Sequence, residues 1–181
     1  MEFKISANIV DVIKRKIFSG QILVRGKKII KITPVNKRLN QYIIPGLIDA
    51  HVHIESSMLV PSEFARLAVR HGTVATVSDP HEIANTLGIE GVKFMFNNGG
   101  KVQFKFFFGV PSCVPATDFE SSGSRIDLQE IKELFLNYKF KYLAEVMNFP
   151  GVINDDKNVV AKINLARRLN KQIDGHAPGL K

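Results

Sequence analysis

The chain has a single cysteine, few acidic residues and no long apolar run, and each shortage excludes a class of protein. The one cysteine, Cys113, cannot build a disulfide framework. No stretch is long and apolar enough to cross a membrane, and the first residues lack the charged and apolar regions of a signal peptide. These absences predict a cytoplasmic protein that does not bind a membrane.

Acidic residues are the minority, since 17 Asp and Glu face 25 Lys and Arg, which gives a net charge of +8. Such a surplus raises the question of a nucleic-acid partner. In the densest cationic stretch, from Lys14 to Arg38, the Lys and Arg residues are interspersed with Ile and Val. This pattern is typical of a sheet with one solvent-exposed face. No recognition helix, zinc finger or aromatic stripe accompanies the charge, so we predict no nucleic-acid partner.

Residues 1–42 contain short runs rich in Ile and Val, which predict β-hairpins in a small β-domain. Ser19-Gly20 separates two of these runs, so we interpret it as a break between two strands. Gly26 lies in the turn of the second hairpin, where a positive φ is needed.

After residue 43 the pattern changes to the spacing of βα units. Strand-like runs begin near Ile43, Thr73, Phe104, Lys141 and Lys171, about 30 residues apart, with helix-like segments between them. The D-x-x-E pattern at Asp127 and the pair Asp155-Asp156 predict the starts of two of these helices. We therefore predict an α/β fold with a parallel sheet over residues 43–181, preceded by the β-domain of residues 1–42.

Two features favour a (β/α)8 TIM-type barrel over a doubly wound sheet. No glycine-rich phosphate loop follows the first strand. Polar residues collect where each strand ends: His51 and His53, Asp79 and His81, Ser112, Glu145 and Asn148, Asp174 and His176. The chain after Pro45 is much shorter than the roughly 250 residues of a typical barrel. We therefore expect the first five βα units of a larger enzyme, inactive by themselves because five strands leave a barrel open.

The sequence IIPGLIDAHVH around His51 and His53 carries the strongest chemical signal. The apolar run Ile43–Ile48 predicts a fully buried strand with the two histidines at its carboxyl end. Residues two apart in a strand point to the same face, so both imidazoles can bind one cation. Two surface histidines at a loop entry are the alternative.

Glu145 and His176 end the fourth and fifth predicted strands. A carboxylate at the end of an apolar strand is costly to bury unless it is paired or bound to metal. Together with His51 and His53, these residues could hold one or two divalent metals. A buried ion pair for Glu145 and a capping imidazole for His176 are the simpler alternatives.

His81 and Glu82 follow Pro80 in a predicted loop, where they could shuttle a proton or contact substrate. Alternatively, Asp79 and Glu82 only cap the next turn. Cys113 lies between two prolines with no activating base nearby in the sequence, so a packed thiol is the better interpretation.

The segments PGLIDAHVHIESSML, HGTVATVSDPHEIAN, PSCVPAT, LAEVMNFPGV and DGHAPGL together resemble the adenine deaminases of the metal-dependent amidohydrolase superfamily. Val146 stands where that family more often has Met. The resemblance implies a β-sandwich domain beside the barrel, and hydrolysis of adenine to hypoxanthine and ammonia by metal-activated hydroxide attack at C6, a step of purine salvage.

The same resemblance implies two metal ions, manganese or iron rather than zinc, at His51, His53, a bridging Glu145 and His176. His81 or Glu82 would protonate the leaving amine. A histidine from the sixth strand and an aspartate from the eighth, both implied by the family, have no counterpart in these residues. Adenine is the implied small-molecule partner, and the complete enzyme is expected to be a homo-oligomer.

Two other functions stay open. The same metal-ligand pattern suits an amidohydrolase that opens cyclic amides such as hydantoins or dihydropyrimidines. A non-catalytic five-stranded α/β binding module is the other possibility, and an open sheet with the first strand in its centre would favour it.

Overall fold

The structure is a computed structural model that describes residues 1–117 and 119–179. It divides into two compact units, Met1–Gly46 and Leu47–Lys181. In the described residues, no helix is long and apolar enough to span a membrane.

The first unit is a four-stranded sheet with the strand order β3-β2-β1-β4. Its strands are β1 (Glu2–Asp11), β2 (Lys16–Arg25), β3 (Lys28–Pro34) and β4 (Tyr42–Ile43). The two predicted hairpins are present, because β1 pairs antiparallel with β2 and β2 with β3, and Gly26 in the second turn has a φ of +60°. The short strand β4 pairs parallel with β1, so residues 42–43 belong to this sheet.

The predicted break at Ser19-Gly20 is wrong, because β2 runs through it without interruption. Gly20 lies opposite Ala7 in the β1–β2 pairing. A Cβ on Gly20 would come 2.5 Å from Cδ1 of Ile9, which is itself buried. The glycine therefore makes room for a core side chain and does not serve a turn.

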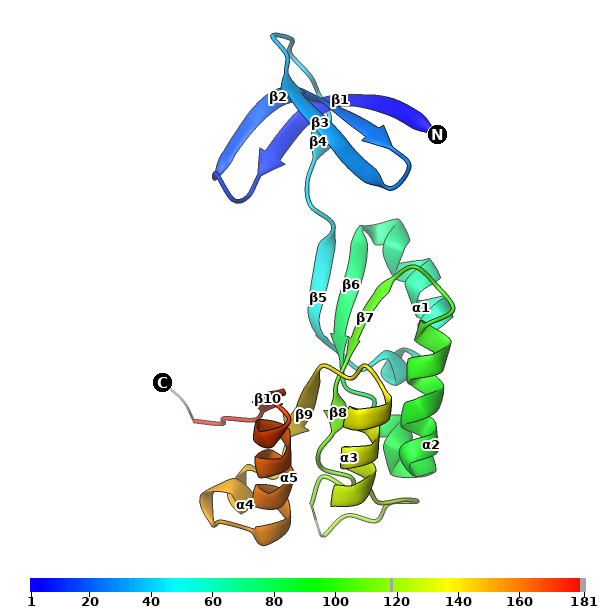
Figure 1. The fold of residues 1–181 in the computed structure, drawn as a ribbon, viewed down its shortest axis with the longest axis vertical. Helices are drawn as coiled ribbons and strands as arrows, with labels where there is room; N and C mark the ends of the chain where they lie inside the picture. The colour runs from blue at the N-terminus through cyan, green and yellow to red at the C-terminus, as the bar shows by residue number, and fades with distance from the viewer. Residues whose placement is uncertain (118, 180–181) are drawn as a thin grey trace. The chain divides into compact units, whose positions relative to one another are not determined.

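The second unit alternates strands and helices, as Figure 1 shows. Its strands are β5 (Leu47–Val52), β6 (Thr73–Ser78), β7 (Lys105–Phe108), β8 (Val110–Pro111), β9 (Tyr142–Val146) and β10 (Gln172–Gly175). Its α-helices are α1 (Pro61–Ala68), α2 (His81–Gly99), α3 (Leu128–Asn137), α4 (Phe149–Ile153) and α5 (Lys157–Arg168). Two short 3-10 helices, Ile54–Ser57 and Val69–His71, flank α1.

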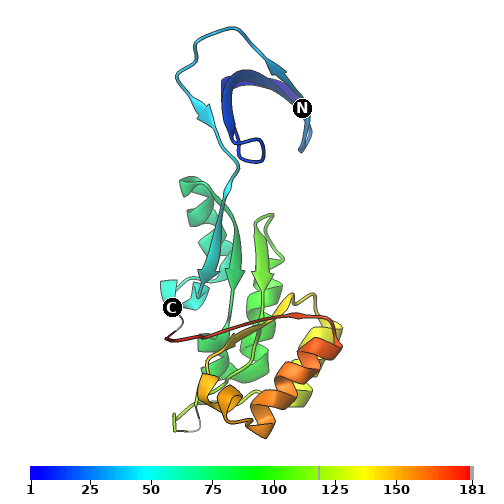
Figure 2. The ribbon, with the colours of Figure 1, turned by 90° about the vertical axis from the view of Figure 1, so that its left-hand side faces the viewer.

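All strand pairs in this unit are parallel, and neighbouring strands follow the order of the chain. Figure 2 shows β5, β6 and β7 running in the same direction. The strands of this unit form two three-stranded sheets, β5-β6-β7 and β10-β9-β8, and Gly109 separates β7 of the first from β8 of the second. Hydrogen bonds from Gly109 N to Ser78 O and from Lys141 N to Phe108 O lie at this junction. The first strand, β5, therefore lies at an edge and not in the centre, which argues against the binding-module alternative.

The prediction that the first strand is fully buried is wrong. Leu47 and Ile48 of β5 are 52% and 62% exposed. Among the described residues β5 pairs with β6 alone, so its other edge stays open. An apolar run at an edge strand cannot be distinguished from a central strand by its sequence alone.

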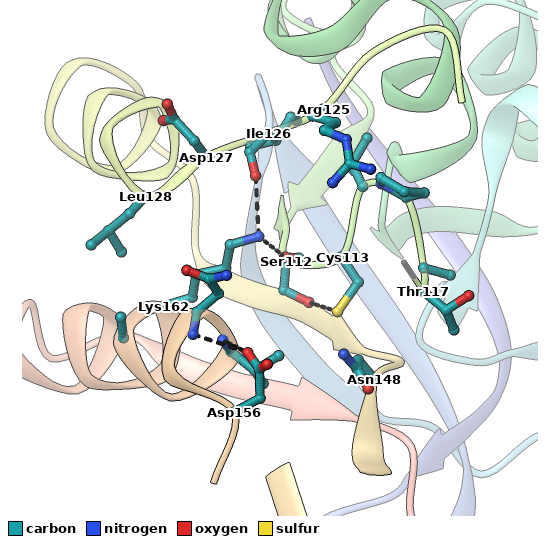
Figure 3. A pocket seen from close by; sticks show the side chains of 16 residues that line it. Ser112, Cys113, Thr117, Arg125, Ile126, Asp127, Leu128, Asn148, Asp156 and Lys162 are labelled. Carbon is teal, nitrogen blue, oxygen red and sulfur yellow. Dashed lines mark hydrogen bonds between the residues drawn. The ribbon is translucent and has the colours of Figure 1, made fainter. Parts of the chain in front are cut away.

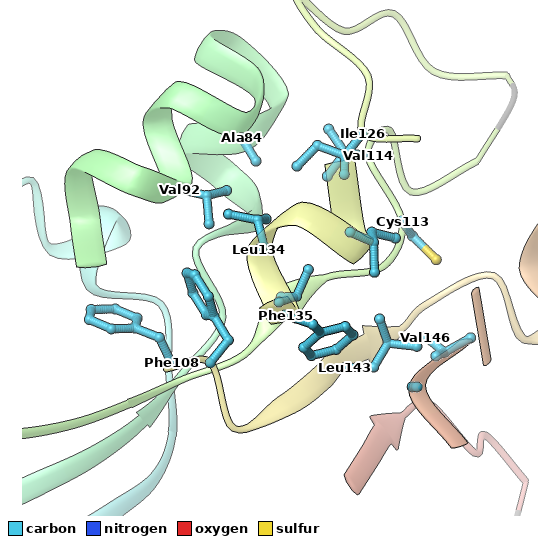
Figure 4. Packing of buried hydrophobic residues seen from close by; sticks show 14 of the residues in the cluster. Ala84, Val92, Phe108, Cys113, Val114, Ile126, Leu134, Phe135, Leu143 and Val146 are labelled. Carbon is cyan, nitrogen blue, oxygen red and sulfur yellow. The ribbon is translucent and has the colours of Figure 1, made fainter. Parts of the chain in front are cut away.

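The core lies between the strands and the helices, and Figure 4 shows Val92 of α2, Leu134 of α3 and Leu143 of β9 among its side chains. The predicted helix starts at Asp127 and Asp156 are present. Asp127 forms a capping box with Glu130, and the Asp156 side chain accepts from the amides of Asn158 and Val159. These caps satisfy the first backbone amides of α3 and α5 and so fix where each helix begins.

Gly109 is required by close packing across the sheet. A Cβ there would lie 2.6 Å from both the Ala144 Cβ and the Tyr142 Cζ. We expect Gly109→Ala to lower the free energy of unfolding by about 1–3 kcal/mol, the usual cost of overpacking. Urea denaturation measures this, with Gly100→Ala as the control, because a Cβ on Gly100 would meet nothing closer than 3.4 Å. Equal stability of the two variants would contradict the packing argument.

Candidate metal centre

The carboxyl ends of four parallel strands bring the predicted site residues together. His51 is in β5 and His53 follows it directly. His81 follows β6, Glu145 lies in β9 and His176 follows β10. Because parallel strands end at the same edge, residues up to 125 positions apart meet in one cluster.

Glu145 is the centre of this cluster, and it is only 5% exposed. Its Oε1 lies 2.5 Å from Nε2 of His51 and 3.5 Å from Nε2 of His53. Its Oε2 lies 3.7 Å from Nδ1 of His81 and 3.9 Å from Nε2 of His176. Each oxygen of one buried carboxylate therefore faces its own pair of imidazoles.

The hydrogen bond of His53 fixes which of its nitrogens can bind a cation. Its Nδ1 lies 3.0 Å from the backbone oxygen of Asp79, and a carbonyl can only accept, so Nδ1 carries the hydrogen. In the neutral ring Nε2 then has a free lone pair. Such a bond to a carbonyl is the usual way in which a metal-binding histidine is oriented.

The spacing of the nitrogens also fits a cation. Nε2 of His51 and Nε2 of His53 are 3.1 Å apart. Two ligands at about 2 Å from a tetrahedral cation lie about 3.3 Å from each other. His51, His53 and Glu145 have one ligand atom each within 4.8 Å of one another. The donor set and its spacing thus fit a divalent metal.

Asp79 adds a second buried carboxylate to the cluster, since it is 2% exposed. Its Oδ2 accepts a hydrogen bond from Nδ1 of His81 at 3.0 Å, while its Oδ1 has no hydrogen-bond partner among the described residues. Asp79, His81 and Glu145 also form a group with ligand atoms within 4.8 Å. Buried carboxylates faced by imidazoles are costly unless positive charge compensates them, which a bound cation would do.

His81 and Glu82 begin helix α2, so their predicted placement in a loop is wrong. The helix starts directly after Pro80, which a sequence pattern can equally assign to a turn. Burial disfavours the charged form of His81, but the hydrogen bond and the negative charge of Asp79 outweigh it and raise the pKa of His81 above its usual value. Both carboxylate oxygens of Glu82 accept from the Ser56 hydroxyl, at 2.7 and 2.6 Å.

Three residues support the site in ways that the sequence did not predict. Asp79 and Ser112 were expected only as polar residues at strand ends, with a cap as the alternative for Asp79. In the structure the Asp79 backbone orients His53 and its side chain orients His81, while the Ser112 hydroxyl donates to the Glu145 backbone oxygen at 2.9 Å. Ser56, which holds Glu82, was not predicted at all. Ser56 and Ser112 act across 26 and 33 positions, and no local pattern shows such contacts.

Residues 42–181 match the model of the amidohydrolase family, so the chain belongs to this family. Among curated relatives, an adenine deaminase of Sulfurovum sp. (strain NBC37-1) is 58% identical over 181 residues, which are 100% of this chain and 34% of the relative. Adenine deaminases of Methanosarcina mazei and Borreliella burgdorferi are 56% and 54% identical, over 96% and 98% of this chain and 31% and 33% of their own lengths. The chain thus spans about a third of the length of the curated relatives it matches.

Proposed function

We propose that these residues form the metal-ligating part of an adenine deaminase, which hydrolyses adenine to hypoxanthine and ammonia. The observation that carries the proposal is Glu145, whose two oxygens each face a pair of imidazoles. The names of the relatives supply the substrate, since the cluster itself suits attack on any electron-poor sp2 carbon.

For the fold, we propose the first five βα units of a (β/α)8 barrel, with the N-terminal sheet as part of a β-sandwich. Two observations support this proposal. The strands follow one another in chain order from an edge, whereas a doubly wound sheet would place the first strand inside. The site residues lie at the carboxyl ends of the strands, where barrel enzymes carry their active sites.

For the metal centre, we propose two divalent ions, manganese or iron, with His51, His53, Glu145 and His176 as ligands. Bound cations of this kind make water a nucleophile near neutral pH and stabilise negative charge that develops during attack. The chain's own part is to fix the ligands. Asp79 holds His53 by its backbone oxygen, and burial keeps Glu145 from competing water.

For proton transfer, we propose His81 as the acid that protonates the departing amine. Its Nδ1–H is engaged by Asp79, which leaves Nε2 as the atom that exchanges a proton. Its side chain is 14% exposed and lies beside Glu145, whereas Glu82 is exposed and held by Ser56. This choice between the two candidates rests on the geometry, because the sequence favours neither.

Substituting His81 and Glu82 one at a time shows which of them protonates the departing amine. We expect His81→Asn to lower kcat by roughly 10²–10⁴-fold, the usual contribution of a general acid or base. Glu82→Gln should lower it by less than about tenfold, because an amide can still accept from Ser56. Steady-state ammonia release measures both variants. A larger loss in Glu82→Gln than in His81→Asn would assign the proton to Glu82 instead.

The activity is tested in a chimera in which these 181 residues replace the corresponding third of the Sulfurovum relative. We expect the chimera, loaded with Mn²⁺, to release ammonia from adenine. The 181-residue chain alone should bind metal without turnover, because β5 and β10, each at an edge of its own described sheet, leave one edge unpaired. Faster opening of hydantoin or dihydropyrimidine than deamination of adenine would contradict the proposed substrate.

A further inference from the structure

The loop between β8 and α3, of which residues 112–117 and 119–126 are described, is closed by hydrogen bonds at its base. Nζ of Lys162 donates to Ser112 O at 2.7 Å and to Ile126 O at 3.1 Å, and Ile126 N donates to Val114 O at 3.3 Å. Figure 3 shows Lys162 with hydrogen bonds to Ser112 and Ile126, at the two ends of the loop. These residues line a cavity of about 260 Å³. Val114 and Ile126 are buried, so the base of the loop is anchored in the core.

The base of this loop contacts the backbone of Glu145. The Ser112 hydroxyl donates to the Glu145 backbone oxygen at 2.9 Å, and the same oxygen accepts from Met147 N at 2.7 Å. Glu145 has a φ of +21°, in the region that residues other than glycine rarely adopt. A strained backbone persists only where its surroundings hold it, and Ser112 is one of the groups that do so.

Gly123 and Ser124, close to the C-terminal base of the loop, contact the first turns of α2, which begin with His81 and Glu82. Helix α2 is interrupted at Gly88, whose φ of 57° and ψ of −145° only glycine adopts without strain. The Asn85 backbone oxygen, placed just before this interruption, accepts from Gly123 N at 2.8 Å and Ser124 N at 3.1 Å. A Cβ on Gly88 would lie 2.4 Å from the Ser124 Oγ, so the interruption makes room for the loop.

We propose that the described residues 112–117 and 119–126 form a clamp loop that fixes Glu145 and the His81–Leu87 turn relative to each other. Its positioning residues are Ser112 and Gly123 of the loop and Gly88 of α2, which act through Glu145 and the helix turn. The inference rests on the proposed function, because it assigns the loop to the same site. It also gives the PSCVPAT segment, for which the sequence suggested no chemistry, a role in aligning two parts of that site.

The clamp is tested with two variants and two matched controls. Ser112→Ala removes the hydrogen bond to Glu145, and Gly88→Ala forces the loop away from α2. Thr117→Ala removes a hydroxyl that contacts Glu120 within the loop, and Gly100→Ala adds a methyl at the other end of α2. In the Mn²⁺-loaded chimera we measure kcat, KM and bound manganese. In the 181-residue chain we measure amide hydrogen exchange over residues 81–87.

We expect Ser112→Ala to lower kcat by about 10²-fold, since a displacement of about 1 Å costs that much. Its KM and bound manganese should stay within about twofold of the parent. Gly88→Ala should speed exchange over residues 81–87 by at least about tenfold, and both controls should match the parent.

Three results overturn the clamp: an unchanged kcat in Ser112→Ala, a fall in kcat that parallels loss of manganese, or unchanged exchange in Gly88→Ala. The second of these would make the loop merely structural. If the unsubstituted chimera releases no ammonia from adenine, the proposed function fails. The exchange measurement needs no turnover, so it still decides whether the loop holds the helix turn.

Discussion

Replacing His51 by alanine is expected to remove metal from the site and to abolish ammonia release in the chimera. His51 supplies one of two nitrogens only 3.1 Å apart that face Glu145, and no described neighbour replaces a lost imidazole there. Substitutions that merely disturb the orientation of a ligand cost about 10–100-fold in metal affinity, so loss of a ligand should cost more. Metal analysis after dialysis, together with the ammonia assay, measures both effects.

His71→Ala is the matched control for His51→Ala. His71 is an exposed histidine at the end of the 3-10 helix Val69–His71, outside the three candidate metal groups. It should keep full metal content and full turnover. A His51→Ala chimera that retains the manganese content of the parent would remove His51 from the ligand set.

Glu145→Gln is expected to be as severe as His51→Ala, although it changes only one atom. A neutral amide offers one oxygen and one NH2 group, so it cannot present an acceptor to each pair of imidazoles. It also removes the negative charge that would bridge two cations. We expect the chimera to lose at least one of two manganese equivalents and its turnover to fall by more than about 10³-fold, beyond the loss of a single acid or base.

Glu90→Gln provides the control for the loss of a carboxylate. Glu90 pairs with Lys93 on the surface of α2, and its side chain is 74% exposed. Surface pairs of this kind contribute at most about 1 kcal/mol, so this variant should bind metal and turn over as the parent does. Two manganese equivalents and full turnover in Glu145→Gln would count against a bridging role.

Much of the fold could be predicted because its signals are local. The spacing of about 30 residues gave the alternation of strands and helices, and the D-x-x-E pattern at Asp127 gave the start of α3. The burial of β5 could not be predicted in this way. Whether an apolar strand lies at an edge depends on which strands pair with it, and that is a property of the whole sheet.

The candidate site, like the fold, combines features that a local sequence pattern predicts with features that depend on distant parts of the chain. His51 and His53 could be placed on one face from the two-residue period of a strand, and their Nε2 atoms do approach each other. Glu145 and His176 could be brought to the same edge because parallel strands end together. The double role of Asp79 could not be foreseen, since it uses a backbone oxygen that any residue possesses. The contact of Ser112 with Glu145 depends on a closed loop whose base is fixed by Lys162 on a distant helix.

The most direct test of the central claim is ammonia release from adenine by the chimera after its metal is removed and Mn²⁺ is added back in measured steps. We expect no turnover without metal and a rise that reaches its maximum at two equivalents per chain. The Glu145→Gln chimera should show no such rise. Turnover of the metal-free chimera, or restoration of Glu145→Gln by the same two equivalents, would contradict the account.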